Sequence, residues 1–195
     1  MDIAKQILIV GGGAGGIATA TSLLKRDRSL DITIIEPSDD HYYQPGWTMV
    51  GAGIVSKEDT RRDTLSVWPS GVTRIKGEVE KFEPAKNLVK LSDGSSIKYE
   101  TLVVACGLKL DWDSIEGLNE ALGKNGVTSN YRYDLAPYTW KLVQEMKGKE
   151  AIFTQPAMPI KCAGAPQKAM YLSCDHWLRN NQLSDMNVSF CNAGP

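Results

Sequence analysis

The chain has 195 residues, of which 42% are hydrophobic and 23% are charged. These proportions are typical of a globular protein and exclude a disordered or collagen-like chain. Twenty-two Lys and Arg residues stand against 23 Asp and Glu residues, which gives a net charge of −1. Because no positive charge is in excess, we expect no nucleic-acid partner.

Two further exclusions follow from sequence patterns. No run of about 18 apolar residues is present to cross a bilayer, and the start, MDIAKQILIV, lacks the pattern of a cleavable signal. We therefore expect no targeting or transmembrane segment in this chain. The four cysteines form no CxxC pair and no zinc-ligand spacing, so no metal site is predicted. Three of them end strands or lie on an apolar helix face, and we expect these to be packing thiols: Cys106, Cys174 and Cys191.

The first 36 residues are expected to form a strand, a helix and a second strand. Residues 6–10 (QILIV) are an unbroken apolar run that ends in glycines, and residues 17–25 have small and apolar residues at helical spacing. Residues 31–36 (DITIIE) form a second β-branched run that stops at Pro37. This βαβ order predicts a parallel sheet.

A β-rich segment follows a long irregular one. Residues 37–69 have no clear periodicity, and a stretch of this length is often functional. The next runs predict short strands over residues 72–75, 78–82, 88–91, 96–99 and 101–105. The turn at residues 92–95 (SDGS) predicts a hairpin, and hence a small antiparallel meander.

The composition predicts a first domain over residues 1–115, a linker rich in Gly, Asn and Asp over 116–130, and a second unit over 131–195. The second unit is expected to contain a helix over 134–147 capped by Asp134, and a strand over 151–154. A helix over 166–179 and a strand over 187–191 are expected to follow. The predicted fold class is α/β, with two Rossmann-like units of parallel sheet, the second of them incomplete.

A GxGxxG motif lies between the first strand and the first helix, at Gly11, Gly13 and Gly16. Glycines at this place allow a tight turn and let backbone N–H groups approach a pyrophosphate at the helix N-terminus. Glu36 ends the next strand, where a carboxylate can accept hydrogen bonds from a ribose and would repel a 2′-phosphate. These residues favour FAD or NAD over NADP. The alternative is a glycine-rich turn with an incidental acid.

Several longer segments resemble the flavoproteins that contain two dinucleotide-binding folds, and most of all the sulfide:quinone oxidoreductase family with its mitochondrial members. The wider group is indicated by residues 41–53 (HYYQPGWTMVGAG) and 99–107 (YETLVVACG). The resemblance to the narrower family is densest in residues 42–53, 129–131 (SNY) and 151–172 (AIFTQPAMPIKCAGAPQKAMYL). It implies an oxidoreductase that binds FAD, oxidises sulfide through two cysteines and passes electrons to a membrane quinone.

The resemblance also implies roles for individual residues. The adenosine diphosphate half of FAD would be held by Gly11, Gly13, Gly16 and Glu36. Pro45 and Trp47 would lie near the flavin. Gly107 would occupy the end of the family's Ala-Thr-Gly turn, although Cys106 replaces the usual threonine.

Cys162 is the expected redox cysteine, because residues 161–168 (KCAGAPQK) resemble the family's first redox-cysteine motif. Pro166 suits the first turn of a helix, so Cys162 is expected just before a positive helix end. Lys161 and Lys168 add two ammonium groups that favour a thiolate and are expected to assist it. The alternative is a buried apolar thiol.

The strand over 151–154 is followed by QPAMP, so the second unit lacks the glycine turn that would hold the phosphates of a nicotinamide dinucleotide. In related NADH dehydrogenases this second fold receives NAD(P)H, and its loss implies that electrons enter elsewhere. The resemblance places the second redox cysteine and the membrane-binding segments beyond Pro195. It also implies peripheral attachment to a bacterial or mitochondrial inner membrane and leaves a homo-oligomer open.

Three other interpretations remain at this point. Two are flavoproteins of related fold, resembling flavocytochrome c sulfide dehydrogenase or type II NADH dehydrogenase. The third is a non-catalytic nucleotide-binding module that keeps the glycine turn without redox chemistry.

Overall fold

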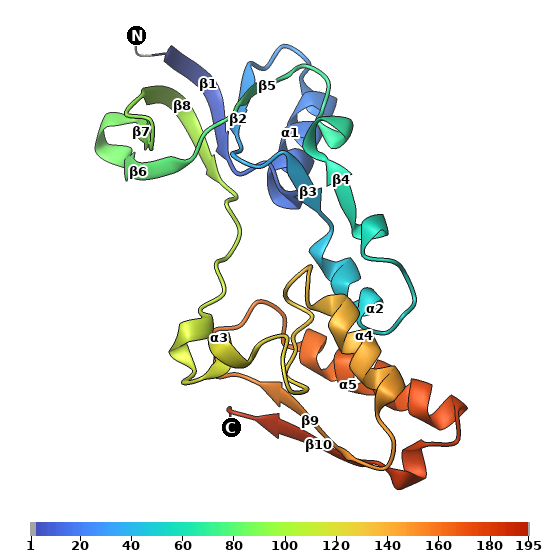
Figure 1. Cartoon of the computed structure of the whole chain (residues 1–195). Helices are drawn as coiled ribbons and strands as arrows, with labels where there is room; N and C mark the ends of the chain where they lie inside the picture. Colours follow the sequence, from blue (N-terminus) through green and yellow to red (C-terminus); the bar gives the residue numbers. More distant parts are fainter. Residues whose placement is uncertain (1–2, 195) are drawn as a thin grey trace. The chain divides into compact units, whose positions relative to one another are not determined.

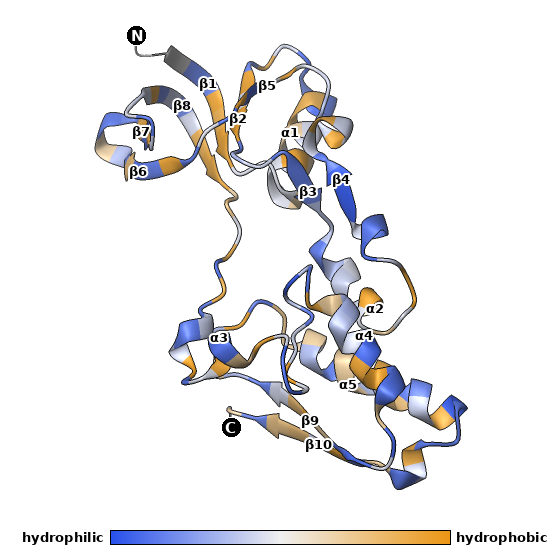
Figure 2. Cartoon of the chain, viewed as in Figure 1, coloured by the Kyte–Doolittle hydropathy of each residue, from blue (hydrophilic) through white to orange (hydrophobic). Residues whose placement is uncertain are grey.

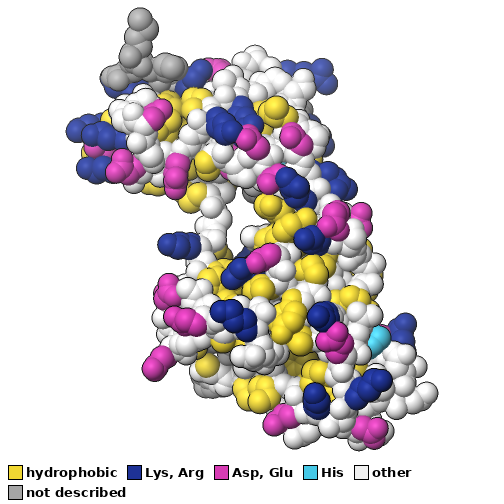
Figure 3. All heavy atoms as spheres, viewed as in Figure 1, with side chains coloured by type: hydrophobic (Ala, Val, Ile, Leu, Met, Phe, Trp, Pro, Cys, Tyr) yellow, Lys and Arg dark blue, Asp and Glu magenta, His cyan; other side chains and the backbone are white. Residues whose placement is uncertain are grey.

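The computed structural model describes residues 3–194, which divide into two compact units (Figure 1). Unit 1 contains the described residues up to Tyr42 together with Arg61–Lys109. Unit 2 contains Tyr43–Thr60 and the described residues from Leu110 onward. Charged side chains of both signs are interspersed over the visible face of each unit (Figure 3), as the near-zero net charge leads one to expect.

Unit 1 is built on a mixed six-stranded sheet with the order β5-β2-β1-β8-β7-β6. Four strands pair in parallel: β1 (Ile3–Val10), β2 (Ile32–Ile35), β5 (Val72–Ile75) and β8 (Ser96–Val104). Two strands extend the sheet in antiparallel pairing: β6 (Val79–Glu83) and β7 (Leu88–Leu91). The crossover helix α1 (Ala14–Arg26) connects β1 to β2.

Both faces of the central strands are buried, which fits the apolar run at residues 7–10 of β1 and the three isoleucines of β2 (Figure 2). On one face, Ile9 packs with Ala20 of α1. On the other face, Leu8 packs with Val89 and Ile97 of the antiparallel strands. Leu8 and Ile9 are fully buried, and such burial contributes about 1.5–3 kcal/mol for each side chain. The sheet therefore holds the end of β1 rigidly.

The remaining elements of unit 1 are short. An antiparallel pair is formed by β3 (Asp40–Tyr42) and β4 (Arg61–Asp63). Arg61 forms an ion pair with Asp40 across this pair at 2.6 Å. Two 3-10 turns complete the unit: η3 (Thr64–Val67) and η4 (Pro84–Lys86).

Unit 2 contains a second βαβ element. The parallel strands β9 (Glu150–Gln155) and β10 (Asn187–Asn192) are connected by α5 (Gly164–Arg179) and η6 (Leu183–Asp185). The other elements of the unit are η1 (Gln44–Gly46), α2 (Trp47–Val50), η2 (Glu58–Thr60), η5 (Trp112–Ser114), α3 (Leu118–Ala121) and α4 (Ala136–Glu145).

The core of unit 2 is centred on Trp177 of α5, which is 1% exposed. Its indole N–H donates a hydrogen bond of 2.8 Å to the carbonyl of Val143 on α4. Ala151 and Phe153 of β9 pack against the same cluster. A buried tryptophan is stable when its polar edge finds such a partner, so this contact fixes α5 against α4 and β9.

The predicted α/β class is confirmed, and three details differ. The strands expected at 96–99 and 101–105 are one strand, β8, so the meander is part of the main sheet. Asp134 does not cap α4, because its carboxylate pairs with Arg132 at 2.5 Å, and Leu135 is the N-cap. The helix expected from residue 166 begins at Gly164.

The partition into units also differs from the domain boundaries expected from sequence. Residues 43–60 were expected in the first domain, and 116–130 were expected to be a linker, but both belong to unit 2. The hydroxyls of Thr128 and Thr139 are hydrogen-bonded at 2.8 Å, which attaches the expected linker to α4. A Cβ atom at Gly51 would lie 2.3 Å from Asn130, so the 43–60 segment also packs closely there.

Candidate functional site

The turn between β1 and α1 requires glycine at two positions. Gly11 has a φ of +104°, and a Cβ atom there would lie 2.4 Å from the carbonyl oxygen of Ala105. A Cβ atom at Gly16 would lie 1.9 Å from the carbonyl oxygen of Gly11. Any larger residue would displace backbone at either position. The two glycines therefore bring the strand end and the helix start into direct contact.

Gly13 differs from these two glycines because it faces open space. It is the N-cap of α1, it is exposed, and nothing lies within 4 Å of the position its Cβ would take. No side chain among the described residues caps α1, and the first turn contains no acidic residue. The N–H groups at a helix start carry a partial positive charge that binds anions. The turn therefore leaves room and donors for a phosphate group.

The Glu36 carboxylate lies against the same turn. Its Oε2 accepts a hydrogen bond of 2.7 Å from the N–H of Gly12, and its Oε1 accepts one of 2.8 Å from the N–H of Ser38. A carboxylate has about four acceptor positions in all. The two backbone bonds fix its orientation and leave acceptor capacity for the hydroxyls of a ribose.

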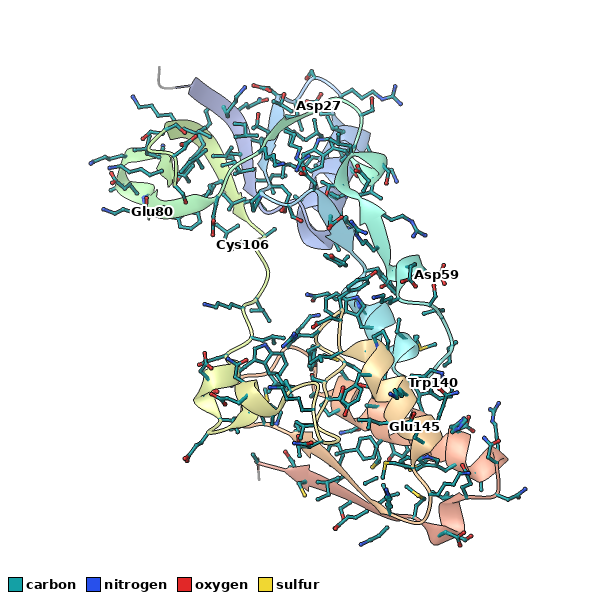
Figure 4. All side chains as sticks on the ribbon, viewed as in Figure 1. Asp27, Asp59, Glu80, Cys106, Trp140 and Glu145 are labelled. Carbon is teal, nitrogen blue, oxygen red and sulfur yellow. The ribbon has the colours of Figure 1, made fainter. Side chains whose placement is uncertain are left out.

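Cys106 lies just beyond the end of β8 (Figure 4), and Gly107 follows it in the sequence. Gly107 has a φ of +74° and nothing within 4 Å of its Cβ position. Cys106 is exposed, and so is Cys191 at the end of β10. The expectation that these two cysteines are packing thiols was wrong, because both lie at strand ends where the burial of the strand has stopped. Cys174 is half-buried, and burial raises the pKa of its thiol.

In unit 2, Cys162 lies in the turn between β9 and α5, which spans residues 156–163 and contains no glycine. The thiol residue is exposed. Its carbonyl oxygen accepts a hydrogen bond of 3.2 Å from the N–H of Ala165, in the first turn of α5. That first turn has no acidic residue, and Lys168 is exposed one turn inside the helix. The surroundings are those of an accessible thiol at a positive helix end.

Tyr131 and Gln44, to which the sequence assigned no role, both contact this turn. The hydroxyl of Tyr131 donates a hydrogen bond of 3.2 Å to the carbonyl oxygen of Cys162. The ammonium group of Lys161 lies 5.6 Å from the centre of the Tyr131 ring and donates a hydrogen bond to the side-chain oxygen of Gln44. Tyr131 and Gln44 lie in segments that carry the family resemblance, but the sequence does not indicate which residues they contact.

Pro45 and Trp47 follow Gln44 in η1 and α2 of unit 2. Pro45 is exposed, whereas Trp47 is 6% exposed and its ring lies 6.2 Å from that of Tyr133. Unit 2 thus brings the Pro45 segment together with Lys161 and Cys162 through Gln44. Unit 1 brings together the glycine turn and Glu36, with Gly107 at the end of the strand beside β1.

A family model described as pyridine nucleotide-disulphide oxidoreductase matches residues 5–144. The match covers more than half of the chain, including the glycine turn and Glu36. The chain belongs to the pyridine nucleotide-disulphide oxidoreductase family. The resemblance to sulfide:quinone oxidoreductases expected from sequence is also confirmed by individual relatives of this family.

Two relatives are mitochondrial sulfide:quinone oxidoreductases. That of Dictyostelium discoideum is 47% identical over 192 residues, which cover 97% of this chain and 42% of the relative. That of Mus musculus is 42% identical over 185 residues, which cover 95% of this chain and 41% of the relative. The chain spans less than half the length of these family members.

A solved structure has the same fold. The X-ray structure of the sulfide:quinone oxidoreductase from the hyperthermophilic bacterium Aquifex aeolicus matches with a TM-score of 0.78 and 25% identity. The match covers 98% of this chain and 44% of the Aquifex chain. Within residues 3–194 of this chain, no helix has the length and the apolar character that a membrane span requires.

Proposed function

We propose that the protein carrying this chain oxidises sulfide with FAD as cofactor and passes two electrons to a quinone. One observation carries the proposal: the turn between β9 and α5 has no glycine and instead presents the exposed Cys162 at a helix start. A turn of this kind lacks a cradle for the phosphates of a nicotinamide dinucleotide. The names of the relatives at 42–47% identity support the same substrates.

The geometry of unit 1 fits the adenosine diphosphate half of FAD. Gly13 and the uncapped start of α1 would receive the pyrophosphate, and Glu36 would accept hydrogen bonds from the ribose. Gly11 and Gly16 would shape the turn. The family resemblance, rather than the geometry of unit 1, is the ground for assigning Gly107, Pro45 and Trp47 to the flavin half. Bound FAD would supply two-electron redox chemistry between a thiol and a quinone.

The proposed thiol chemistry begins with a sulfur bridge between Cys162 and a second cysteine of the protein. A hydrosulfide anion attacks the second cysteine's sulfur, the S–S bond breaks, and Cys162 leaves as a thiolate that carries the electron pair. The second cysteine then holds the added sulfur atom as a persulfide. The positive end of α5 with Lys161 and Lys168 would stabilise the Cys162 thiolate.

The place of the protein in the cell is proposed from its relatives. Two relatives bear mitochondrial names, and a membrane quinone as acceptor requires contact with a membrane. We therefore propose peripheral attachment to a mitochondrial or bacterial inner membrane, and we leave a homo-oligomer open.

The experiment is sulfide-dependent reduction of the flavin followed by its reoxidation with quinone, measured by absorbance. Cys162→Ser should abolish bleaching by sulfide, whereas Cys191→Ser, which changes another exposed thiol, should leave it unchanged. Normal sulfide-dependent quinone reduction in Cys162→Ser would overturn the mechanism. Bleaching by NADH would indicate a type II NADH dehydrogenase, and reoxidation by cytochrome c would indicate a flavocytochrome-like partner. A protein that binds no flavin would be a nucleotide-binding module without this chemistry.

A further inference from the structure

Three segments far apart in sequence meet at the Cys162 turn. Gln44 comes from η1, Tyr131 precedes α4, and Lys161 directly precedes Cys162. The contacts span 117 residues between Lys161 and Gln44 and 31 residues between Tyr131 and Cys162. All four residues belong to unit 2. Contacts of such separation are formed only in the folded unit, so the fold itself determines where the Lys161 side chain lies.

Tyr131 contacts both neighbours in this turn. Its hydroxyl is bound to the carbonyl of Cys162 at 3.2 Å, and its ring centre lies 5.6 Å from the Lys161 ammonium group. A cation above an aromatic ring is attracted to the ring face. Because one side chain contacts both residues, it sets the position of the ammonium group relative to the thiol residue.

The electrostatics of the cluster agree with this geometry. Partial burial lowers the pKa of Lys161, and the nearby charge of Cys162 acts in the opposite direction. Burial also raises the pKa of Tyr131, and the charge of Cys162 adds to that increase. A Cys162 thiolate would therefore interact with both the ammonium group and the phenol.

A lysine held in this way differs from an ordinary surface lysine. The free side chain has about 2 kcal/mol of rotamer entropy, and its charge is spread over many positions in solvent. Gln44 accepts a hydrogen bond from the ammonium group on one side, while the Tyr131 ring contacts it on another. Neither partner carries a negative charge, so the positive charge is fixed in place without being neutralised.

We propose that Gln44 and Tyr131 are positioning residues that hold the Lys161 ammonium group beside Cys162 and thereby favour anionic reactants at this thiol. The inference rests on the proposed function, in which the substrate is the hydrosulfide anion. The fixed positive charge would raise the local concentration of that anion at the sulfur bridge.

The test compares two alkylating reagents on the full chain, with each cysteine measured separately by peptide mass spectrometry. Iodoacetate is an anion and iodoacetamide is neutral, so their rate ratio at Cys162 reports the local positive charge. Lys161→Met should lower the ratio about threefold at low salt, the effect of removing one unit charge a few ångströms away in a water-like dielectric. Gln44→Ala and Tyr131→Leu displace this charge without removing it, so each should lower the ratio by a smaller factor, about twofold.

The controls are within the same molecule. The ratios at Cys106 and Cys191, both exposed, should not change in any variant. Tyr138→Phe, which removes another hydroxyl that contacts backbone in unit 2, should leave the ratio at Cys162 unchanged. Added salt should lower the ratio in the unmodified chain and have less effect in Gln44→Ala.

A ratio at Cys162 that stays the same in both Gln44→Ala and Tyr131→Leu would overturn the inference. Tryptophan fluorescence and the unfolding midpoint of each variant separate this outcome from a failure to fold. A variant that folds correctly keeps Trp177 buried, so both values should match those of the unmodified chain. The assay uses neither sulfide nor quinone. A lowered ratio in a protein that fails to oxidise sulfide would support the positioning role and overturn only the proposed substrate.

Discussion

The backbone N–H of Gly12 donates a hydrogen bond of 2.7 Å to Oε2 of Glu36, across a separation of 24 residues. This contact joins the glycine turn to the end of β2. It orients the Glu36 carboxylate, which we propose accepts hydrogen bonds from a ribose. The two ends of the neighbouring parallel strands thus form one preorganised surface.

Glu36→Gln should weaken FAD binding about tenfold while the chain still folds. The amide keeps the size of the side chain and one acceptor, but it loses the charge that strengthens hydrogen bonds by roughly 1–2 kcal/mol. The measurement is the FAD dissociation constant by fluorescence titration. Glu80→Gln, at an exposed position of unit 1, should bind FAD normally. Equal affinity of Glu36→Gln and the unmodified chain would contradict the ribose role.

Substitutions at two glycines of this turn should separate its contribution to stability from its contribution to FAD binding. Gly16→Ala should lower the free energy of unfolding by more than about 2 kcal/mol, because its Cβ would lie 1.9 Å from the Gly11 carbonyl oxygen. Gly13→Ala should change it by less than about 1 kcal/mol, because its Cβ would lie in open space.

FAD binding should show the complementary result for Gly13→Ala. Its methyl group would occupy the space into which a pyrophosphate must come close to the backbone. We expect FAD affinity to fall at least about tenfold despite the nearly unchanged stability. Urea unfolding and FAD titration of the two variants provide the measurements. Unchanged FAD affinity in a stable Gly13→Ala variant would argue against phosphate binding at this turn.

The sequence predicted most of unit 1 because its signals are local. The apolar runs of β1 and β2, the GxGxxG turn and the SDGS hairpin each depend on neighbouring residues. The prediction of two separate strands, over 96–99 and 101–105, was wrong. These residues form one strand, β8, which pairs with β1 on both sides of residue 100. Pairing with a partner strand overrode the local pattern there.

Unit 2 was harder to predict because its organisation depends on distant contacts. Asp134 is a residue type that often caps a helix, yet its carboxylate binds Arg132 instead. This hydrogen bond lowers the pKa of Asp134. The partnership of Gln44 with Lys161 crosses 117 residues, and no local pattern indicates it. The position of Cys162 just before a helix start was predicted from its motif, while its exposure and the residues that surround it became visible only in the structure.

Glu83 should make the stability of unit 1 depend on acid pH. Hydrogen bonds from Lys86 and then Lys90 lower its pKa from 4.5 to about 2. Because the folded-state pKa is the lower one, the stabilising contribution is fully present above about pH 4.5. It is lost as the pH falls through about 2.

The variant Glu83→Gln tests this dependence. Its urea midpoint should be lower than that of the unmodified chain at pH 7, and the difference should shrink toward pH 2. Glu80→Gln, an exposed change on the same strand, should show little difference at either pH. A difference that persists undiminished at pH 2 would show that the Glu83 charge is not its origin.

The thiol of Cys174 should react with a disulfide reagent more slowly than the thiols of the other three cysteines. Burial raises its pKa and restricts access, whereas Cys106, Cys162 and Cys191 are exposed. With a chromogenic disulfide reagent at neutral pH, we expect three thiols to react quickly and one slowly. Cys174→Ala should remove the slow phase, and guanidinium should merge it with the fast one. Four equally fast thiols in the folded chain would contradict the burial of Cys174 on α5.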